Sequence, residues 1–439
     1  MQSYSLIGPT KYEPWWWEAA NRKIIDDTAL PREVDIAVVG SGFTGLSAAR
    51  TLALGGRDVL VLEDGVLGVG ASTRNAGFLG RQLLAGFSSI MKRQGLQPAI
   101  DLYRGASDAY DFTLNLMKSK NIKCHLSERG RFLPAWNQAQ YDFAAKEFAI
   151  QHKHTGLEGG MINADEMSQE LRCGGGVGGL LITNTGSVHP GLYHDGLLGL
   201  AKQAGVGMRD RTRVTAINTD RNAYYLQTER GIIKAKQVVI ATNGYTGSET
   251  RWFRRRLVRA RAFMAATEPL NPELIKQLIP SDRTYVDYSR NLFNYWRRAP
   301  DTSNRILFGG QIGFLHRRLD RIADGLKNDM GRVFPELEEV KFSHVWEGTI
   351  AFTVDRLPHI SNRDGLYFAF GCNGAGLPMG TYIGHKTGLK ILGSNDSGTP
   401  FDDLPFPLSP SIMGYAWYLP LLTAWARWQD KRGLPSSGH

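Results

Sequence analysis

A strand-like segment followed by three spaced glycines limits most strongly how this chain can fold. Residues 34–39 (VDIAVV) predict a buried strand, and Gly40, Gly42 and Gly45 follow it in a GxGxxG pattern. Gly40 allows a tight turn, Gly42 lets the backbone approach a pyrophosphate, and Gly45 lets a helix pack closely on the strand. The Ala- and Leu-rich residues 44–54 predict that helix, whose positive N-terminal end would face phosphate groups.

A second strand completes the unit. The segment DVLVLE ends in Glu63, near the position roughly 20 residues after the first glycine where an acid binds a ribose 2′-hydroxyl. Asp64, the next residue, is expected to lie in the same nucleotide-binding site. GxGxxG alone is weak evidence, but strand, helix, second strand and acid together predict a dinucleotide site. The acid argues against a 2′-phosphate, and NAD and FAD both remain open at this point.

The loop at residues 68–80 (GVGASTRNAGFLG) is rich in small and polar residues. It resembles the GASxRNxG loop of the D-amino-acid-oxidase-like flavoprotein family, in which this segment lies along the pyrophosphate and flavin. The resemblance implies FAD as the cofactor. It is expected to be noncovalent, because residues 66–82 contain neither His nor Cys. Thr73 and Ala76 replace glycines of the family pattern, so a slightly displaced turn is expected. The cofactor residues expected here are Phe43, Thr44, Gly70, Ala71, Ser72, Thr73, Arg74, Asn75, Ala76 and Gly77.

Later segments resemble the family in the same order, from about residue 12 to residue 430. Residues 211–217 resemble a strand that meets the adenine, and residues 236–247 resemble a second strand beside the nucleotide. Residues 365–380 resemble the strand, turn and helix whose N-terminus faces the flavin. The cofactor residues that this resemblance implies are Val214, Ala241, Thr242, Asn243, Gly348, Gly374, Ala375, Gly376 and Leu377. Within the family, the chain looks most similar to the γ-glutamylputrescine oxidases and the aminophosphonate oxidoreductases.

The resemblance implies a mixed α/β fold with two discontinuous parts. A Rossmann-type FAD-binding domain is expected at residues 32–90, 150–250 and 345–400. A substrate domain with an antiparallel sheet is expected at residues 91–149 and 251–344. Residues 401–439 are expected to form a C-terminal helical tail.

Composition excludes few classes of protein. The formal net charge is +10, with a dense basic cluster at residues 251–261, but no nucleic-acid motif accompanies it and no nucleic acid is expected as a partner. Three separated cysteines show no metal-ligand spacing, so no metal is expected, and they fit a reducing cytoplasm. The start of the chain shows no secretory signal pattern. The aromatic segment near the C-terminus is too short to span a bilayer; a helix packed on the body is expected, with membrane-surface contact as the alternative.

Aromatic and basic residues suggest where a substrate binds. Tyr288, Phe293 and Tyr295 are candidate pocket residues, and strand alternation places Phe293 and Tyr295 on one face and Trp296 on the other. Plain core packing is the competing interpretation. Arg290 and Arg297 could each hold a substrate anion through two parallel hydrogen bonds, with placement on the solvated surface as the competing interpretation, and Arg74 could bind the cofactor or the substrate anion.

The resemblance implies oxidation of an amine or amino acid by hydride transfer to the flavin, followed by hydrolysis of the imine. The net charge favours a substrate that also carries an anionic group. Electrons would pass to O₂ in an oxidase. The alternatives are a dehydrogenase that passes them to a quinone or partner protein, and a non-catalytic flavoprotein subunit. The sequence leaves the oligomeric state open.

Overall fold

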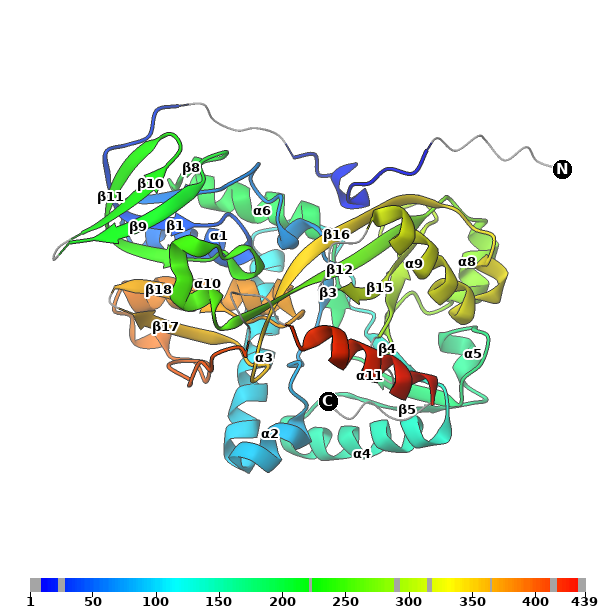
Figure 1. The fold of residues 1–439 in the computed structure, drawn as a ribbon. Helices are drawn as coiled ribbons and strands as arrows, with labels where there is room; N and C mark the ends of the chain where they lie inside the picture. The colour runs from blue at the N-terminus through cyan, green and yellow to red at the C-terminus, as the bar shows by residue number, and fades with distance from the viewer. Residues whose placement is uncertain are drawn as a thin grey trace.

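The computed structural model describes residues 9–22, 28–220, 223–287, 293–313, 318–363, 365–410 and 417–432. Two eight-stranded sheets lie side by side with helices packed around them (Figure 1). This arrangement confirms the mixed α/β fold class expected from the sequence.

The first sheet contains the predicted nucleotide-binding unit. Its order is β17-β18-β11-β1-β2-β8, with β10 paired to β11 and β9 paired to β10. β1 pairs in parallel with β2 and β11, while β9, β10 and β17 add antiparallel edges. The strands are β1 (Glu33–Val39), β2 (Val59–Leu62), β8 (Gly207–Arg209), β9 (Val214–Thr219), β10 (Tyr224–Thr228), β11 (Gly231–Ile240), β17 (His359–Arg363) and β18 (Leu366–Phe370).

The second sheet has the order β16-β12-β15-β14-β13-β4-β6-β5. It is antiparallel except where β13 pairs in parallel with β4. Its strands are β4 (Arg131–Ala135), β5 (Gly159–Asn163), β6 (Gly178–Ile182), β12 (Leu257–Thr267), β13 (Thr284–Val286), β14 (Tyr295–Arg298), β15 (Ile306–Gly313) and β16 (Phe342–Thr353). A separate pair is formed by β3 (Phe78–Leu79) and β7 (Gly186–Ser187).

Helices cover both sheets. The α-helices are α1 (Phe43–Leu54), α2 (Phe87–Gln94), α3 (Leu96–Ser119), α4 (Gln138–Thr155), α5 (Met167–Glu170), α6 (Pro190–Gln203), α7 (Arg251–Arg254), α8 (Pro272–Leu278), α9 (Leu319–Val333), α10 (Gly376–Ile391) and α11 (Leu419–Lys431). Short 3₁₀ turns are η1 (Trp15–Trp17), η2 (Ala71–Thr73), η3 (Asn243–Tyr245), η4 (Ser248–Thr250), η5 (Pro335–Leu337) and η6 (Asn395–Ser397).

Strands β12 and β16 join the two halves of the molecule. Their pairing runs from Leu257 opposite Thr353 to Ala266 opposite His344, and after a one-residue register shift it continues to Thr267 opposite Phe342. Leu257 packs in the core of the first sheet, whereas Phe263 packs in the core of the second. This long ribbon therefore holds the substrate-side sheet in a fixed position beside the nucleotide-binding sheet (Figure 1).

Helix α10 lies against helix α1 along a row of glycines. Gly380, Gly384 and Gly388 are spaced four residues apart, so they share one helix face. A Cβ at Gly384 would lie 2.2 Å from the carbonyl oxygen of Thr44, and one at Gly388 would lie 2.8 Å from the Cβ of Thr51. The backbones of the two helices can approach this closely only because these positions lack side chains.

Some segments lie elsewhere than expected. Strand β6 pairs with β4, and β5 pairs with β6, in the second sheet, although residues 150–250 were expected on the nucleotide side. Helix α3 was expected on the substrate side, but its Thr113 hydroxyl donates to the carbonyl of Pro378 at 3.2 Å and its Tyr110 packs in the core of the first sheet. Strand pairing and helix packing bring together segments that are far apart in the chain. Local sequence patterns do not predict such contacts. The domain boundaries themselves stay a prediction.

Changing Gly384 to Ala should lower the free energy of unfolding by about 1–3 kcal/mol, because the new methyl group would meet a backbone oxygen that cannot move alone. Gly199→Ala is the matched control. Gly199 is also helical, in α6, but nothing lies within 4 Å of its added Cβ, so alanine should stabilise by up to about 1 kcal/mol. Thermal unfolding of both variants checks this. Equal melting temperatures for the two would contradict close packing of α10 on α1.

Candidate active site

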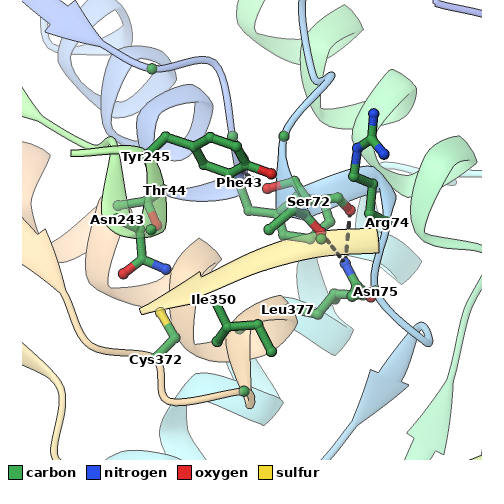
Figure 2. A pocket seen from close by; sticks show the side chains of 18 of the residues that line it. Phe43, Thr44, Ser72, Arg74, Asn75, Asn243, Tyr245, Ile350, Cys372 and Leu377 are labelled. Carbon is green, nitrogen blue, oxygen red and sulfur yellow. Dashed lines mark hydrogen bonds between the residues drawn. The ribbon is translucent and has the colours of Figure 1, made fainter. Parts of the chain in front are cut away.

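A cavity of about 630 Å³ lies between the first sheet and the substrate-side sheet. Many of the predicted residues line it: Gly40, Gly42, Phe43, Thr44, Glu63, Asp64, Gly70, Ala71, Ser72, Arg74, Asn75, Ala76, Val214, Ala241, Thr242, Asn243, Phe293, Tyr295, Gly348, Gly374, Ala375, Gly376 and Leu377. Figure 2 shows side chains from segments far apart in the chain converging there.

The turn after β1 brings backbone, not side chains, to the cavity. Gly40 has φ +105°, and a Cβ there would lie 2.9 Å from the carbonyl oxygen of Ala241. Gly42 has no side chain to cap α1, and only the first amide of the helix, that of Phe43, donates to a side chain, the Ser72 hydroxyl, at 3.0 Å. Gly45 does not line the cavity; a Cβ there would lie only 1.9 Å from the oxygen of Gly40, so its role is the close packing of helix on turn.

Glu63 reaches back to this turn. One carboxylate oxygen accepts from the Ser41 amide at 2.8 Å and from the Ser41 hydroxyl at 2.6 Å. The other accepts only a long bond from the Gly65 amide at 3.5 Å. Glu63 therefore stabilises the turn with one oxygen and presents the other beside the cavity, where it can accept from a ribose hydroxyl.

The loop before β3 is held by its own side chains. Asn75 donates to the carbonyls of Ala71 and Ser72 at 3.1 and 2.8 Å, and its Oδ1 accepts from the Gly77 amide (Figure 2). The Ser72 hydroxyl accepts from the Phe43 amide at 3.0 Å, which ties the loop to the first turn of α1. Gly77 has φ +74° and lies outside the cavity lining.

Thr73 also lies outside the cavity lining, and the structure explains why it replaces a glycine. Its hydroxyl donates to the carbonyl of Gly68 at 2.6 Å and accepts from the Trp17 indole at 3.0 Å. Trp17 belongs to the turn η1, in which Trp16 is fully buried against Trp346 and its neighbours. The N-terminal turn thus packs behind the loop.

A second helix begins at the cavity. Ala375 precedes α10 without a side-chain cap, and Gly376 begins the helix at the cavity wall. Cys372 lines the same wall, and burial raises the pKa of its thiol to about 12. Two open helix N-termini, glycine backbone and one free carboxylate oxygen fit a dinucleotide with a pyrophosphate and ribose groups.

Arg74 holds two segments together at the cavity wall. Its guanidinium donates to the carbonyls of Val69 at 2.7 Å and Glu347 at 3.0 Å, and it stacks over the Trp17 ring at 4.6 Å. Burial lowers its pKa from the ordinary value. Because two of its nitrogens already bind backbone oxygens, its capacity to bind a substrate anion is reduced.

The second sheet and its neighbouring segments bring aromatic rings and a buried cation to the cavity. Phe78, Phe293 and Tyr295 line the cavity, and burial raises the pKa of Tyr295. Trp296 instead stacks in the core against Tyr285, as strand alternation predicted.

Arg131 also lines the cavity from this sheet. It is 6% exposed, and its guanidinium carbon lies 5.4 Å from the centre of the Phe78 ring.

Arg297 lies elsewhere than its proposed role requires. It is buried outside the cavity lining, donates to the carbonyl of Val188 at 2.8 Å, and has a pKa lowered by burial to about 10. It shares a strand face with Tyr295, but that face extends beyond the cavity. Tyr288 and Arg290 lie outside the described residues.

The sequence interpretation missed Arg131. An arginine within the apolar segment RFLPA was the available signal, because a charged residue in a buried strand needs a specific partner or function. Tyr245 and Ile350 were also missed as lining residues. They come from the turn after β11 and from β16, and only the fold brings them to the cavity (Figure 2).

Comparisons with known proteins agree with this geometry. The family model described as FAD dependent oxidoreductase matches residues 35–388. The chain is 29% identical to a probable oxidoreductase OrdL of Haemophilus influenzae over 85% of this chain and 86% of that protein. It is 27% identical to the gamma-glutamylputrescine oxidoreductase of Escherichia coli, covering 95% of this chain and 97% of that protein.

Solved structures share the fold. Glycine oxidase from Geobacillus kaustophilus aligns with a TM-score of 0.71 and 23% identity, over 87% of this chain and all of that one. L-proline dehydrogenase from P. horikoshii aligns with a TM-score of 0.67 and 18% identity, over 93% of this chain and all of that one. The resemblance drawn from the sequence is confirmed, and the chain belongs to the family of FAD-dependent oxidoreductases.

Proposed function

We propose that the protein oxidises an amine that also carries an anionic group. The carbon–nitrogen bond becomes an imine, which water hydrolyses to a carbonyl compound and an amine or ammonia. The observation that carries this proposal is a single cavity with a dinucleotide-like cradle on one side and the buried guanidinium of Arg131, beside aromatic rings, on the other.

FAD, when bound, would accept the hydride from the carbon next to the amine nitrogen. The chain's own residues would position both molecules. Glu63 would hold a ribose, and the open N-terminus of α1 would hold the pyrophosphate. The N-terminus of α10 would stabilise negative charge at the edge of the flavin.

The substrate side of the cavity favours a neutral amine. Phe78, Val286, Phe293 and Ile312 supply apolar lining there. Apolar surroundings disfavour an ammonium ion, so an amine entering this space loses its proton more easily and can then give up a hydride. Arg131 would anchor the anionic end and leave the amine end among these side chains.

The names of two relatives support the proposed substrate class. One is called gamma-glutamylputrescine oxidoreductase and another, from Geobacillus kaustophilus, is called glycine oxidase. Glycine and γ-glutamylputrescine each contain an amine and a carboxylate. A substrate panel should include acidic, uncharged and cationic amines, scored by anaerobic bleaching of the flavin absorbance.

The same experiment tests the electron acceptor. Admitting air after bleaching should restore the absorbance within seconds if O₂ is the acceptor. Slow recovery that a quinone analogue accelerates would instead identify a dehydrogenase. An absorbance that no amine bleaches would overturn the proposal and favour a non-catalytic subunit.

The purified protein should release FAD on acid or heat precipitation. Among the described residues that line the cavity there is no histidine, and the one cysteine is Cys372. Its raised pKa keeps the thiol protonated and a poor nucleophile. The supernatant is assayed for FAD by chromatography. Flavin that stays with the precipitated chain would contradict noncovalent binding, and FMN or NAD in the supernatant would contradict the assignment to this cavity.

Two changes in the turn should weaken FAD binding to different degrees. Glu63→Gln should cost about 1.5–3 kcal/mol, because it removes a charge-assisted bond to the ribose. Gly42→Val should cost more, since a Cβ there would lie 2.9 Å from the Ser72 hydroxyl and occupy space for the pyrophosphate. Glu33→Gln, in the exposed start of β1, is the control. Equal flavin occupancy in all three would show that the turn has only a structural role.

Arg131→Gln should raise the KM for acidic amines by about 10- to 150-fold, the value of one charge-assisted contact. The KM for uncharged amines should change little, and Arg131→Lys should recover part of the loss. Arg129→Gln is the matched control, because Arg129 lies two residues away and is exposed. Steady-state kinetics on flavin-loaded enzyme measures these effects. An equal rise for charged and uncharged substrates would contradict anion binding by Arg131.

A further inference from the structure

An aromatic stripe faces outward on the last described helix. Trp417 lies in the turn just before α11, and Leu421, Trp425 and Trp428 follow within the helix at intervals of four and three residues, which places these three on one helix face. Their exposed fractions are 51%, 66%, 50% and 47%. We call these four residues the α11 stripe.

The opposite side of α11 fixes this orientation. Leu419 and Gln429 are 9% and 7% exposed, and the Tyr418 hydroxyl lies 3.5 Å from the hydroxyl of Ser409. These contacts attach the helix to the body. The expected packing of this helix on the body is only partly met, because its largest apolar side chains point away from the body.

Positive charge lies beside the stripe. The guanidinium of Arg432 sits 4.0 Å from the centre of the Trp428 ring. Ser409, next to the start of α11, donates its amide to the carbonyl of Arg255 at 3.0 Å, so the basic segment around α7 adjoins the helix. The side chains of Arg251 and Arg255 are exposed.

We propose that the α11 stripe docks the protein onto an anionic lipid surface. Tryptophan prefers the boundary between lipid headgroups and acyl chains, and nearby arginines gain from negatively charged headgroups. Among the described residues, no helix is long and apolar enough to cross a membrane, so the contact is interfacial. A second copy of the chain would bring like charges together, which makes it the poorer occupant for this surface.

This site goes beyond the proposed oxidation, because it concerns where the enzyme works rather than what it converts. It also gives the enzyme access to acceptors dissolved in a membrane.

The test is flotation of the flavin-loaded, full-length protein with vesicles of phosphatidylcholine alone or mixed with phosphatidylserine. The protein should bind the mixed vesicles, bind less at high salt, and bind plain phosphatidylcholine weakly. Trp425→Ser combined with Trp428→Ser should lower the partition coefficient about tenfold or more. Ile232→Ser is the matched control, because Ile232 is 61% exposed on β11, away from this helix.

A second arm tests charge. Arg251→Glu with Arg255→Glu should reduce binding to the mixed vesicles and leave the weak binding to plain vesicles unchanged. Flavin absorbance and melting temperature confirm that each variant is folded. No binding of the unchanged protein to mixed vesicles at low salt would overturn the proposal, as would equal binding by the tryptophan variant. A loss of self-association in that variant without vesicle binding by the parent protein would instead assign the stripe to a second copy.

Discussion

The direct approach of the α10 backbone to α1 determines where the active site can form. Gly384 lies against the carbonyl oxygen of Thr44, and Gly388 lies against Thr51. Any side chain at these points would push the helices apart. Because they touch, their two N-terminal ends open at the same cavity, and one cofactor could lie across both. Electrostatic stabilisation by a helix end falls off within about one turn. Close helix packing is therefore a condition for chemistry at this site.

The second sheet forms the wall of the cavity that faces the first sheet. It brings apolar rings and one guanidinium to a cavity whose other wall is mostly backbone. Arg131 and Arg297 show that the position of a charged side chain on a sheet determines what it can bind. Both are buried arginines on strands of this sheet, yet one faces the cavity and the other donates to the carbonyl of Val188. The ribbon of β12 and β16 keeps these walls at a fixed separation, so substrate anchoring and cofactor binding depend on one rigid frame.

Local patterns in the sequence were enough to predict the nucleotide-binding unit and the facing of side chains on β14. The βαβ unit around Gly40 and Glu63 was predicted from strand periodicity and glycine spacing, both of which act over a few residues. The opposite facing of Tyr295 and Trp296 followed from the two-residue repeat of a strand, and the structure confirms it.

What the sequence could not supply is long-range. Arg131 lines the cavity because β4 pairs beside β13, whose residues lie about 150 positions later, and no local pattern encodes that pairing. The same reason explains why the packing of α3 against α10 and the first sheet was not predicted. Arg297 lies on the predicted strand face. Strand alternation predicts which face of the sheet a side chain lies on, but not whether that part of the face borders the cavity. How far along its face a cavity extends depends on the elements stacked above it.

The N-terminal turn has a consequence for biosynthesis. Trp16 is buried among residues that include Trp346, its ring packs edge-on against His189, and the Lys11 amide donates to the carbonyl of Ser343. A ribosome releases the tryptophans of this turn long before it makes their binding surface. During that interval they remain exposed to solvent and to other nascent chains, a condition that favours aggregation and chaperone binding. A turn that is synthesised early thus reaches its final position only after the strand that carries Trp346 has been made.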